Sequence, residues 1–454
     1  MQYKNLTLDP FQAEAIEYVK ARKSVLVSAP TGVGKTIIAD FVVEQSIREG
    51  ERVIYTAPIK ALSNQKYREF TRDHDPSLIG LVTGDLVLNR DAPVVIMTTE
   101  ILRNMLLQEE VGLDRLAYVI FDEIHFLGDP ERGTVWEETL IYLPQPVKIL
   151  GLSATLSNIH EFARWLSFVR EEKVEVIVEK ERKVPLEILI ANRDAGVLPP
   201  DLFRKRFERK LSRLERRLRE EGWNIRSTAA IKATTRHFEV VEMIREDYLP
   251  CLYFVFSRRL TETYARDLER RTQTSFLTEA ERRRLDEELT TFLQENAIDL
   301  ERHAPMYRKG IAFHHAGLNV RLKWLVEHLY EARLIKVLYC TSTFALGMNM
   351  PARSVVFDDI RKYDGRSVVP LTTLQFMQKA GRAGRRGMDE KGYVVIKQDF
   401  LHFLLNQSHL ATYEKGKVER IASSFNLSFN SIVNLIERYP IEAIETIIQK
   451  SFRN

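Results

Sequence analysis

Short apolar runs recur through the first third of the chain, separated by stretches with helical spacing. The runs are rich in β-branched residues and are bounded by loop or helix signals, which is typical of buried strands. A helical pattern over residues 35–50 ends at Gly50. Alternating strands and helices predict a parallel sheet covered by helices on both faces. The five candidate strands are residues 24–28, 53–57, 94–98, 118–123 and 148–155.

The same alternation returns after residue 250. Its candidate strands are residues 251–257, 311–315, 335–341, 354–357 and 393–397. The sequence therefore predicts an α/β protein with two tandem domains, each built on a parallel sheet. We place the domains at 1–180 and 250–405, with a linker at 181–249 and a short helical C-terminal segment at 406–454.

The predicted linker contains a strongly basic stretch. Residues 203–221 hold nine basic and four acidic side chains. Apolar residues recur at spacings of four and three, which predicts an amphipathic helix. They are Phe203, Phe207, Leu211, Leu214 and Leu218. A solvated arm is a more frequent role for such a charge run than a nucleic-acid contact, and we favour it. A second helix is expected inside the second domain, at residues 276–297.

Composition narrows the class of protein. The chain has 454 residues with 44% hydrophobic and 29% charged side chains, and Lys plus Arg exceed Asp plus Glu by 67 − 63 = 4. These values are typical of a globular protein and exclude a disordered or collagen-like one. We expect no membrane segment, because no run approaches the ~18 apolar residues of a span. The first residues carry no apolar signal core. Two cysteines provide no disulfide framework and no zinc set, so we expect a cytoplasmic protein.

The segment APTGVGKT (29–36) follows a predicted strand and opens a predicted helix, as a phosphate-binding loop requires. Gly32 and Gly34 allow backbone N–H groups to surround phosphate oxygens, and the helix N-terminus adds partial positive charge. Lys35 is expected on the β- and γ-phosphates, and the Thr36 hydroxyl on Mg²⁺. Ala29 stands where glycine is usual. The candidate phosphate-binding residues are Thr31, Gly32, Val33, Gly34, Lys35 and Thr36.

The strand YVIFDEIH (118–125) ends in two carboxylates. Asp122 is the candidate Mg²⁺ ligand, and Glu123 is the candidate base that orients and deprotonates the attacking water. The alternative is that these are two surface acids. An apolar strand leads directly into the pair, so this alternative is less favoured. A phosphate loop and a later strand that ends in acids together indicate a nucleoside triphosphatase that uses ATP and Mg²⁺.

The second domain carries an arginine-rich segment, QKAGRAGRRG (378–387). Arg382, Arg385 and Arg386 are spaced by glycine and alanine, and small residues would let them project from a closely packed helix. Arginine keeps its charge and binds phosphate with a planar fork. A basic surface helix is the alternative. With the phosphate loop of the first domain, the segment predicts an arginine finger that completes the site when the two domains close.

With these motifs the chain resembles a superfamily-two DExH-box helicase, in the branch of exosome-associated Ski-type RNA helicases. The resemblance covers nearly the whole chain, and the motifs stand in the family's order. The segments that carry it, besides 29–36, are LDPFQAEAI (8–16), APIKALSNQKY (57–67), VTGD (82–85), TTEILRNML (98–106), DEIHFLGDPERGTVWEE (122–138), GLSATLSN (151–158), VFSRR (255–259), HHAGL (314–318), TSTFALGMNMPA (341–352) and QKAGRAGRRG (378–387).

The resemblance implies two RecA-like domains with ATP in the cleft and a nucleic-acid strand across their top. Phe11 and Gln12 would lie at the adenine base. Gln378 would contact the γ-phosphate or the attacking water, and Arg382 and Arg385 would stabilise the transferred phosphoryl group. Gly347 and Asn349 would lie beside the ribose, where many relatives carry Asp at the Asn349 position.

The resemblance also implies contacts to the nucleic-acid strand. Short hydroxyl, amide and backbone donors suit phosphate and sugar contacts, which fix register without reading sequence. A lone threonine, taken singly, is more often a helix cap. For His125, His314 and His315 we favour structural coupling over zinc binding or catalysis. The candidates for strand contact are Pro58, Lys60, Asn64, Gln65, Gly84, Asp85, Thr98, Thr99 and Thr341.

The expected partner is single-stranded RNA or RNA with a 3′ overhang, with 3′-to-5′ movement, together with exonuclease or adapter proteins in RNA decay or processing. The core is expected to be monomeric, and its last helices resemble the start of a winged helix. Two alternatives stay open: a DNA-unwinding helicase of the same superfamily, and an ATP-gated RNA clamp without processive unwinding. Arg386 and residues 132–138 favour the RNA branch. Glu123 and the arginine segment favour turnover over a clamp.

Overall fold

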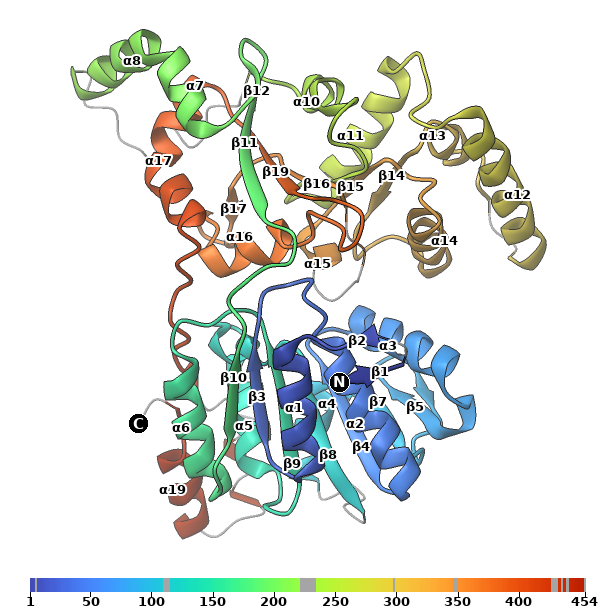
Figure 1. Cartoon of the computed structure of the whole chain (residues 1–454), viewed down its shortest axis with the longest axis vertical. Coiled ribbons are helices and arrows are strands. Elements are labelled where there is room, and N and C mark those ends of the chain that lie inside the picture. The colour runs from blue at the N-terminus through green and yellow to red at the C-terminus, as the bar shows by residue number, and fades with distance from the viewer. Residues whose placement is uncertain are drawn as a thin grey trace. The chain divides into compact units, whose positions relative to one another are not determined.

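The computed structural model describes residues 1–4, 6–108, 115–220, 234–296, 299–345, 350, 352–425, 432–433, 436–437 and 441–452. The chain forms two compact units (Figure 1). Unit 1 is Met1–Glu181 together with Val418–Asn454, and unit 2 is Arg182–Lys417. None of the described helices combines the length and apolar content needed to cross a bilayer.

Unit 1 is built on an eight-stranded sheet in the order β10-β3-β9-β8-β4-β7-β5-β6. All neighbours are parallel except β5 and β6. The five strands predicted in this region are confirmed as β3, β4, β7, β8 and β9. The strands are β3 (Val25–Ser28), β4 (Arg52–Ala57), β5 (Ile79–Val82), β6 (Val87–Leu88), β7 (Val94–Thr98), β8 (Leu116–Phe121), β9 (Lys148–Ser153) and β10 (Glu175–Val178), with a separate ribbon of β1 (Gln2–Tyr3) and β2 (Leu6–Thr7).

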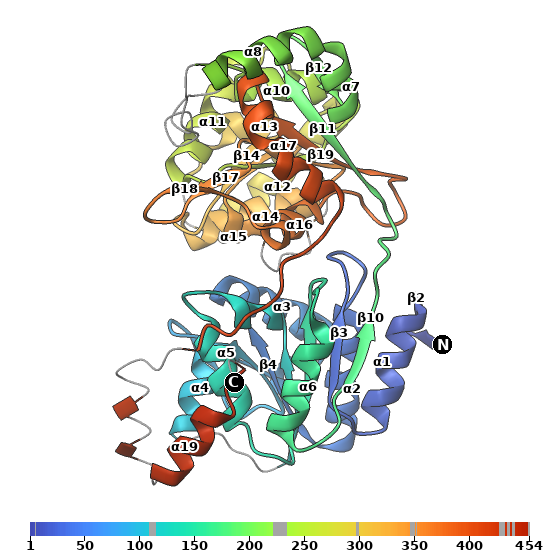
Figure 2. The ribbon, with the colours of Figure 1, turned by 90° about the vertical axis from the view of Figure 1, so that its left-hand side faces the viewer.

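Helices cover both faces of this sheet, as predicted (Figure 2). One buried apolar cluster joins α1, α2 and α3 to the sheet, and a second joins α4, α5 and α6 to the opposite face. Strands covered on both faces have no polar face, which is why they appear as continuous apolar runs. The helices are α1 (Pro10–Lys20), α2 (Thr36–Glu49), α3 (Lys60–Asp73), α4 (Thr99–Leu107), α5 (Gly133–Tyr142) and α6 (Ile159–Arg170), with 3₁₀ turns at Pro76–Leu78 and Ile124–Gly128.

After unit 2, the chain returns to unit 1 and packs on α5 and α6. The backbone of Ile421 is held at both its N–H and its carbonyl by the Asn158 side chain, each at 2.9 Å. Phe452 lies against Phe162 and Trp165, with ring centroids 5.7 and 5.2 Å away. The helix α19 (Ile441–Gln449) precedes this contact.

Unit 2 is built on a seven-stranded sheet in the order β12-β11-β19-β16-β13-β15-β14. Only β11 and β12 pair antiparallel. The five predicted strands are confirmed, but β11 lies in the stretch expected to be a linker. The strands are β11 (Leu186–Asn192), β12 (Gly196–Leu198), β13 (Cys251–Phe254), β14 (Ile311–His314), β15 (Val337–Cys340), β16 (Ser354–Phe357) and β19 (Gly392–Lys397), with a separate hairpin of β17 (Arg361–Tyr363) and β18 (Val368–Pro370).

The helices of unit 2 include the helix predicted at 276–297, which is confirmed as α12. The helix α17, expected in the C-terminal segment from residue 406, belongs to unit 2 and begins at Phe400. The helices are α7 (Pro200–Arg206), α8 (Glu208–Glu220), α10 (His237–Ile244), α11 (Arg258–Arg271), α12 (Glu279–Glu295), α13 (Ala304–Arg308), α14 (Val320–Glu331), α15 (Ser342–Ala345), α16 (Thr373–Ala380) and α17 (Phe400–Glu414).

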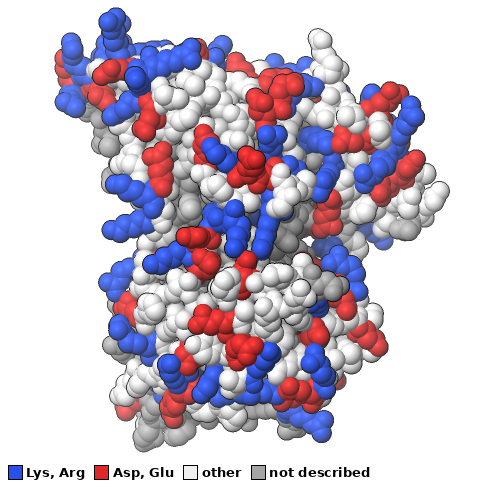
Figure 3. Space-filling model, in the orientation of Figure 1, with Lys and Arg blue, Asp and Glu red and all other residues white. Residues whose placement is uncertain are grey.

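The basic stretch predicted as one amphipathic helix forms two, α7 and α8, which meet at Phe207. Phe203 is fully buried against Phe400 and Phe403, and Leu211 is 3% exposed. The ammonium group of Lys210 lies 3.6 Å from the centre of the Phe400 ring. Lys and Arg side chains gather over these helices at the upper left of Figure 3. The apolar stripe packs on unit 2, and the basic side chains face solvent.

Candidate functional site

The predicted phosphate loop lies between β3 and the first turn of α2, at the carboxyl edge of the unit 1 sheet. Gly32 and Gly34 have φ values of +87° and +90°. Only glycine adopts this left-handed backbone without strain, and it turns successive N–H groups inward. Val33 points into the core and is 2% exposed. The loop therefore has the backbone form that a phosphate group needs.

Lys35 donates to backbone carbonyls of this loop. Its ammonium group donates to the carbonyl oxygens of Ala29 and Pro30, at 2.7 and 3.0 Å. Carbonyls are weaker partners for a cation than phosphate oxygens, so a bound phosphate would compete well for this group. The position fits the role predicted for Lys35.

Gln12 holds the same loop from α1. Its Oε1 accepts the N–H of Asp9 at 2.8 Å, and its Nε2 donates to the carbonyls of Val33 and Gly34 at 3.3 and 2.9 Å. The neighbouring Phe11 is buried with Val33 in one apolar cluster. The structure thus gives Gln12 an anchoring role that the sequence did not reveal, and its contact with adenine stays a prediction.

The two acids follow β8 as predicted. Asp122 is half-buried, and the Tyr55 hydroxyl on β4 donates to its Oδ2 at 2.6 Å. Burial, followed by the charge of Glu123, raises the pKa of Asp122, and the nearby Lys66 ammonium opposes this shift. A cation beside Asp122 would stabilise the ionised form of its carboxylate. Among the described residues no three His, Cys, Asp or Glu side chains form a metal cluster. A Mg²⁺ ion at Asp122 and Thr36 would therefore take its other ligands from phosphate and water.

Glu123 has a φ of +53°, which is uncommon for a residue other than glycine. Its carboxylate lies 3.3 Å from Nδ1 of His125. The same nitrogen lies 3.3 Å from the backbone N–H of Ala154, in the segment that follows β9. Burial, with a contribution from Lys35, lowers the pKa of His125 to about 3, so its ring is neutral. Nδ1 of the neutral ring accepts the Ala154 N–H, so His125 is held by the 151–158 motif beside Glu123, and its coupling role stays a prediction.

Three predicted strand-contacting residues meet at the unit 1 surface. The Lys60 ammonium donates to both carboxylate oxygens of Asp85 at 2.8 Å. A side chain added at Gly84 would lie 3.1 Å from the Lys60 ammonium. Lys60, Gly84 and Asp85 therefore form one exposed cluster.

Other predicted strand contacts are less accessible. Gln65 is 7% exposed and its amide donates to Glu69 at 2.6 Å, while Thr98 and Thr99 are 6% and 0% exposed. The Pro58 carbonyl accepts from Arg132 at 2.6 Å, and Oδ1 of Asn64 is buried. These side chains support the surface in this conformation, and their contact with a strand stays a prediction.

In unit 2, Gln378 is 9% exposed near the end of α16, and the arginines follow the helix. The sequence predicts a closely packed helix at these arginines, which is wrong, because they lie in turns beyond Ala380. Gly384 has a φ of +85°, and a Cβ there would lie 3.1 Å from the backbone of Gly392. A side chain at position 384 would collide with the backbone of Gly392, so glycine is required where these turns pack on the sheet.

Arg385 is engaged within its own unit. Its Nε and Nη2 each lie 2.7 Å from the carboxylate of Asp389, a bidentate pair. The Arg382 carbonyl accepts from Ala352, which fixes the turn before it. Thr341 follows β15, and its N–H donates to the His314 carbonyl at 3.2 Å. Gly347 and Asn349 lie outside the described residues.

Sequence reasoning missed two buried groups next to this machinery. Tyr55 reads as one more residue of an apolar strand, and nothing in the sequence connects it to Asp122. Lys379, beside Gln378, is 5% exposed, and burial lowers its pKa to about 7. Only a periodicity analysis of α16 would have placed this lysine on the buried face.

Comparisons with known proteins agree with this geometry. Residues 9–162 match the DEAD/DEAH box helicase family. The chain is 37% identical to the ATP-dependent RNA helicase mtr4 of Schizosaccharomyces pombe, over 95% of this chain and 40% of that protein. It is 38% identical to the human exosome RNA helicase MTR4, over 98% and 43%. It is 36% identical to the antiviral helicase SKI2 of Saccharomyces cerevisiae, over 98% and 39%.

Residues 9–162 form a DEAD/DEAH box helicase domain. The chain is homologous, over nearly its full length, to the Mtr4 and Ski2 helicases. It spans about two fifths of the length of these three relatives. The predicted family and the two sheets typical of RecA-like domains are thereby confirmed.

Proposed function

We propose that this chain is the ATP-hydrolysing core of an RNA helicase, which acts on single-stranded RNA or RNA with a 3′ overhang. The observation that carries the proposal is the pairing of a left-handed glycine loop with two acids at the end of β8, on one edge of one sheet. The names of the similar proteins support RNA as the substrate.

The residues of unit 1 have separate roles in binding and hydrolysing ATP. The loop N–H groups and Lys35 bind the phosphates, and Thr36 and Asp122 would hold Mg²⁺. When bound, Mg²⁺ neutralises phosphate charge and orients the terminal phosphoryl group. Glu123 orients the attacking water and accepts its proton. Tyr55 and Gln12 keep Asp122 and the loop in position.

In unit 2, Gln378 contacts the γ-phosphate or the water, and Arg382 and Arg385 stabilise charge on the transferred phosphoryl group. Arg385 has to exchange Asp389 for phosphate to take this role, and we propose that it does so mainly in the transition state. Lys60, Gly84 and Thr341 contact the strand through its phosphates and sugars. An exonuclease or an adapter protein in RNA decay is the proposed partner.

The test is the steady-state ATPase rate without nucleic acid, with single-stranded RNA, and with single-stranded DNA of the same sequence. Salt is held constant, because phosphate contacts weaken steeply with it. Stimulation by RNA alone supports the proposal. Equal or greater stimulation by DNA would instead indicate a DNA-unwinding helicase. Binding of RNA without any stimulation identifies an ATP-gated clamp.

A further inference from the structure

The arginine turns, residues 381–387, begin where α16 ends at Ala380. A helix leaves its last carbonyls without helical partners, and the negative end of its dipole lies at this terminus. Gly381 is the C-cap residue of α16, so its carbonyl is one of these groups. The turns therefore need donors from elsewhere in the chain to hold their backbone.

Arg182, the first residue of unit 2, supplies such donors. Its Nη1 and Nη2 each donate to the Gly381 carbonyl at 3.4 Å, and its Nη2 also donates to the Ala383 carbonyl at 3.0 Å. Its Nε donates to the Val184 carbonyl at 3.1 Å, which ties the guanidinium plane to its own segment. One planar guanidinium fork thus spans the two carbonyls that flank Arg382.

The carbonyl of Arg382 is also bonded. It accepts from the Ala352 N–H at 2.9 Å, and the Ala352 carbonyl accepts from the Gly384 N–H at 2.8 Å. Together with the bonds from Arg182, three successive carbonyls at residues 381–383 have donors. This bonding restricts the direction in which the Arg382 side chain leaves the backbone.

The segment 182–185 packs on the same turns. A Cβ built at Gly384 would lie 2.5 Å from Cγ1 of Val184. The Pro185 carbonyl accepts from the Gly392 N–H at 2.9 Å. Unit 2 begins with this segment, so it is one of the two places where the chain passes between the units. The passage into unit 2 is thus fixed directly on the arginine turns.

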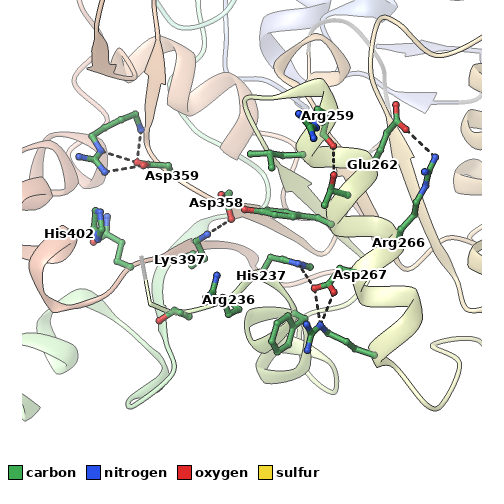
Figure 4. Close-up of a pocket in the computed structure, with 18 of the residues that line it drawn as sticks. Arg236, His237, Arg259, Glu262, Arg266, Asp267, Asp358, Asp359, Lys397 and His402 are labelled. Carbon is green, nitrogen blue, oxygen red and sulfur yellow. Dashed lines mark hydrogen bonds and ion pairs between the residues drawn. The ribbon is translucent and has the colours of Figure 1, made fainter. Parts of the chain in front are cut away.

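Other arginines of unit 2 are placed differently. Arg236 and Arg259 are exposed and line a cavity of about 1200 Å³ elsewhere in the unit (Figure 4). Arg182 is half-buried, and its donors face backbone carbonyls. Burial, followed by the charge of Arg382, lowers the pKa of Arg182 to about 10, so its guanidinium stays charged at pH 7. Its geometry is that of a cation that holds a backbone.

We propose that Arg182 is a positioning residue for ATP hydrolysis, which acts through the backbone of the arginine turns and fixes where Arg382 projects. The inference rests on the proposed function, because that function assigns Arg382 to the transferred phosphoryl group. Catalytic groups must be placed closely, and a displacement of about 1 Å can cost about 10²-fold in rate. Loss of the Arg182 fork should therefore lower kcat by up to about 10²-fold, with little change in the KM for ATP.

The first experiment compares Arg182→Met, Arg182→Lys and the control Lys180→Met in the full chain. Steady-state ATPase activity is measured at saturating RNA, with thermal unfolding in parallel. Methionine keeps an apolar stem without donors. Lysine keeps the charge, but one ammonium group cannot reproduce a planar fork on two carbonyls. Both Arg182 variants should lose kcat at unchanged KM, and Arg182→Lys should unfold closer to the wild-type temperature. Lys180 is exposed, and Lys180→Met should match the wild type.

A double-mutant cycle gives a readout that a merely structural role would not change. Arg382→Ala removes the group that Arg182 is proposed to position. If Arg182 acts through Arg382, Arg182→Met should lower kcat much less in the Arg382→Ala background than in the wild type. A loss of folded protein would lower kcat by the same factor in both backgrounds, and that result would overturn the inference.

The outcomes separate the two proposals. A wild type that does not hydrolyse ATP, or an Arg382→Ala variant with the wild-type kcat, overturns the proposed function of the arginine turns. A loss of kcat in Arg382→Ala, with both Arg182 variants at the wild-type kcat, overturns the positioning role alone. Full kcat in Arg182→Lys but not in Arg182→Met would show that charge suffices and would overturn positioning by the fork. A raised KM at unchanged kcat would overturn it in favour of nucleotide binding.

Discussion

The hydroxyl of Tyr55 on β4 donates a 2.6 Å hydrogen bond to Oδ2 of Asp122, the first residue after β8. Tyr55 is fully buried, and its hydroxyl fixes the orientation of a carboxylate proposed to hold Mg²⁺. Outer partners of this kind orient metal ligands and determine the affinity of the metal.

Tyr55→Phe should therefore raise the Mg²⁺ concentration needed for half-maximal ATPase activity. The removed hydroxyl leaves one Asp122 oxygen without its donor, and losses of this type reduce metal affinity or activity by about 10- to 100-fold. The measurement is ATPase rate against free Mg²⁺ at saturating ATP and RNA.

The matched control is Tyr118→Phe. Tyr118 is also buried on a neighbouring strand, but its hydroxyl donates to the carbonyls of Val19 and Lys23, at 3.2 and 3.0 Å. Both variants should lose about 1 kcal/mol of stability. Only Tyr55→Phe should change the Mg²⁺ dependence, and equal Mg²⁺ curves for the two variants would refute the positioning role.

Glu123→Gln should bind ATP and RNA but hydrolyse ATP poorly. The amide keeps the shape of the side chain and cannot accept a proton from water, and loss of a general base costs about 10²- to 10⁴-fold in rate. Single-turnover hydrolysis and nucleotide binding are measured in parallel. Turnover equal to that of the wild type would exclude Glu123 as the base.

Arg385→Ala should lower kcat, by up to about 10³-fold, with little loss of ATP affinity, because the contact is made mainly in the transition state. The pair with Asp389 supplies a sharp control. Asp389→Ala breaks the same ion pair but leaves the arginine in place. A purely structural pair predicts equal losses in both variants, whereas a catalytic Arg385 predicts a large loss only in Arg385→Ala.

The sheets could be predicted because their central strands are buried on both faces and stand out as apolar runs. The exceptions have physical causes. The β5 strand contains Gly80, and glycine is depleted in strands, so its apolar run is interrupted. The β11 strand pairs with β19 about 200 residues later, and no local pattern reveals this partnership. The local pattern therefore predicts a linker at this strand.

The nucleotide-binding residues could be predicted because their chemistry is local: the glycine loop and the Asp122–Glu123 pair are each contiguous. Contacts that depend on the tertiary fold were not accessible. Gln12 reaches the loop from α1, and Tyr55 reaches Asp122 from a neighbouring strand. The motifs that contain Gln65 and Thr99 do not reveal whether these side chains are exposed or buried. In the structure both are buried.

Lys379→Met should stabilise unit 2, most clearly at low pH. Burial, with help from the Lys362 charge, lowers the pKa of Lys379 to about 7, and its ammonium group donates to the Gln375 carbonyl at 3.1 Å. Below pH 7 the wild type carries a buried charge that the unfolded chain exposes to water. Above pH 7 the folded side chain is neutral, so the unfolded state binds more protons and wild-type stability rises with pH. Thermal unfolding at pH 6 and pH 9 should give a higher Tm for Lys379→Met, with a difference that narrows at pH 9.

Each kcal/mol gained corresponds to about 2–4 °C in a unit of this size. The control is Lys205→Met on α7, an exposed lysine whose replacement should leave Tm nearly unchanged at both values. A lower Tm for Lys379→Met at pH 6 would show that the buried ammonium stabilises the fold and would reject the argument.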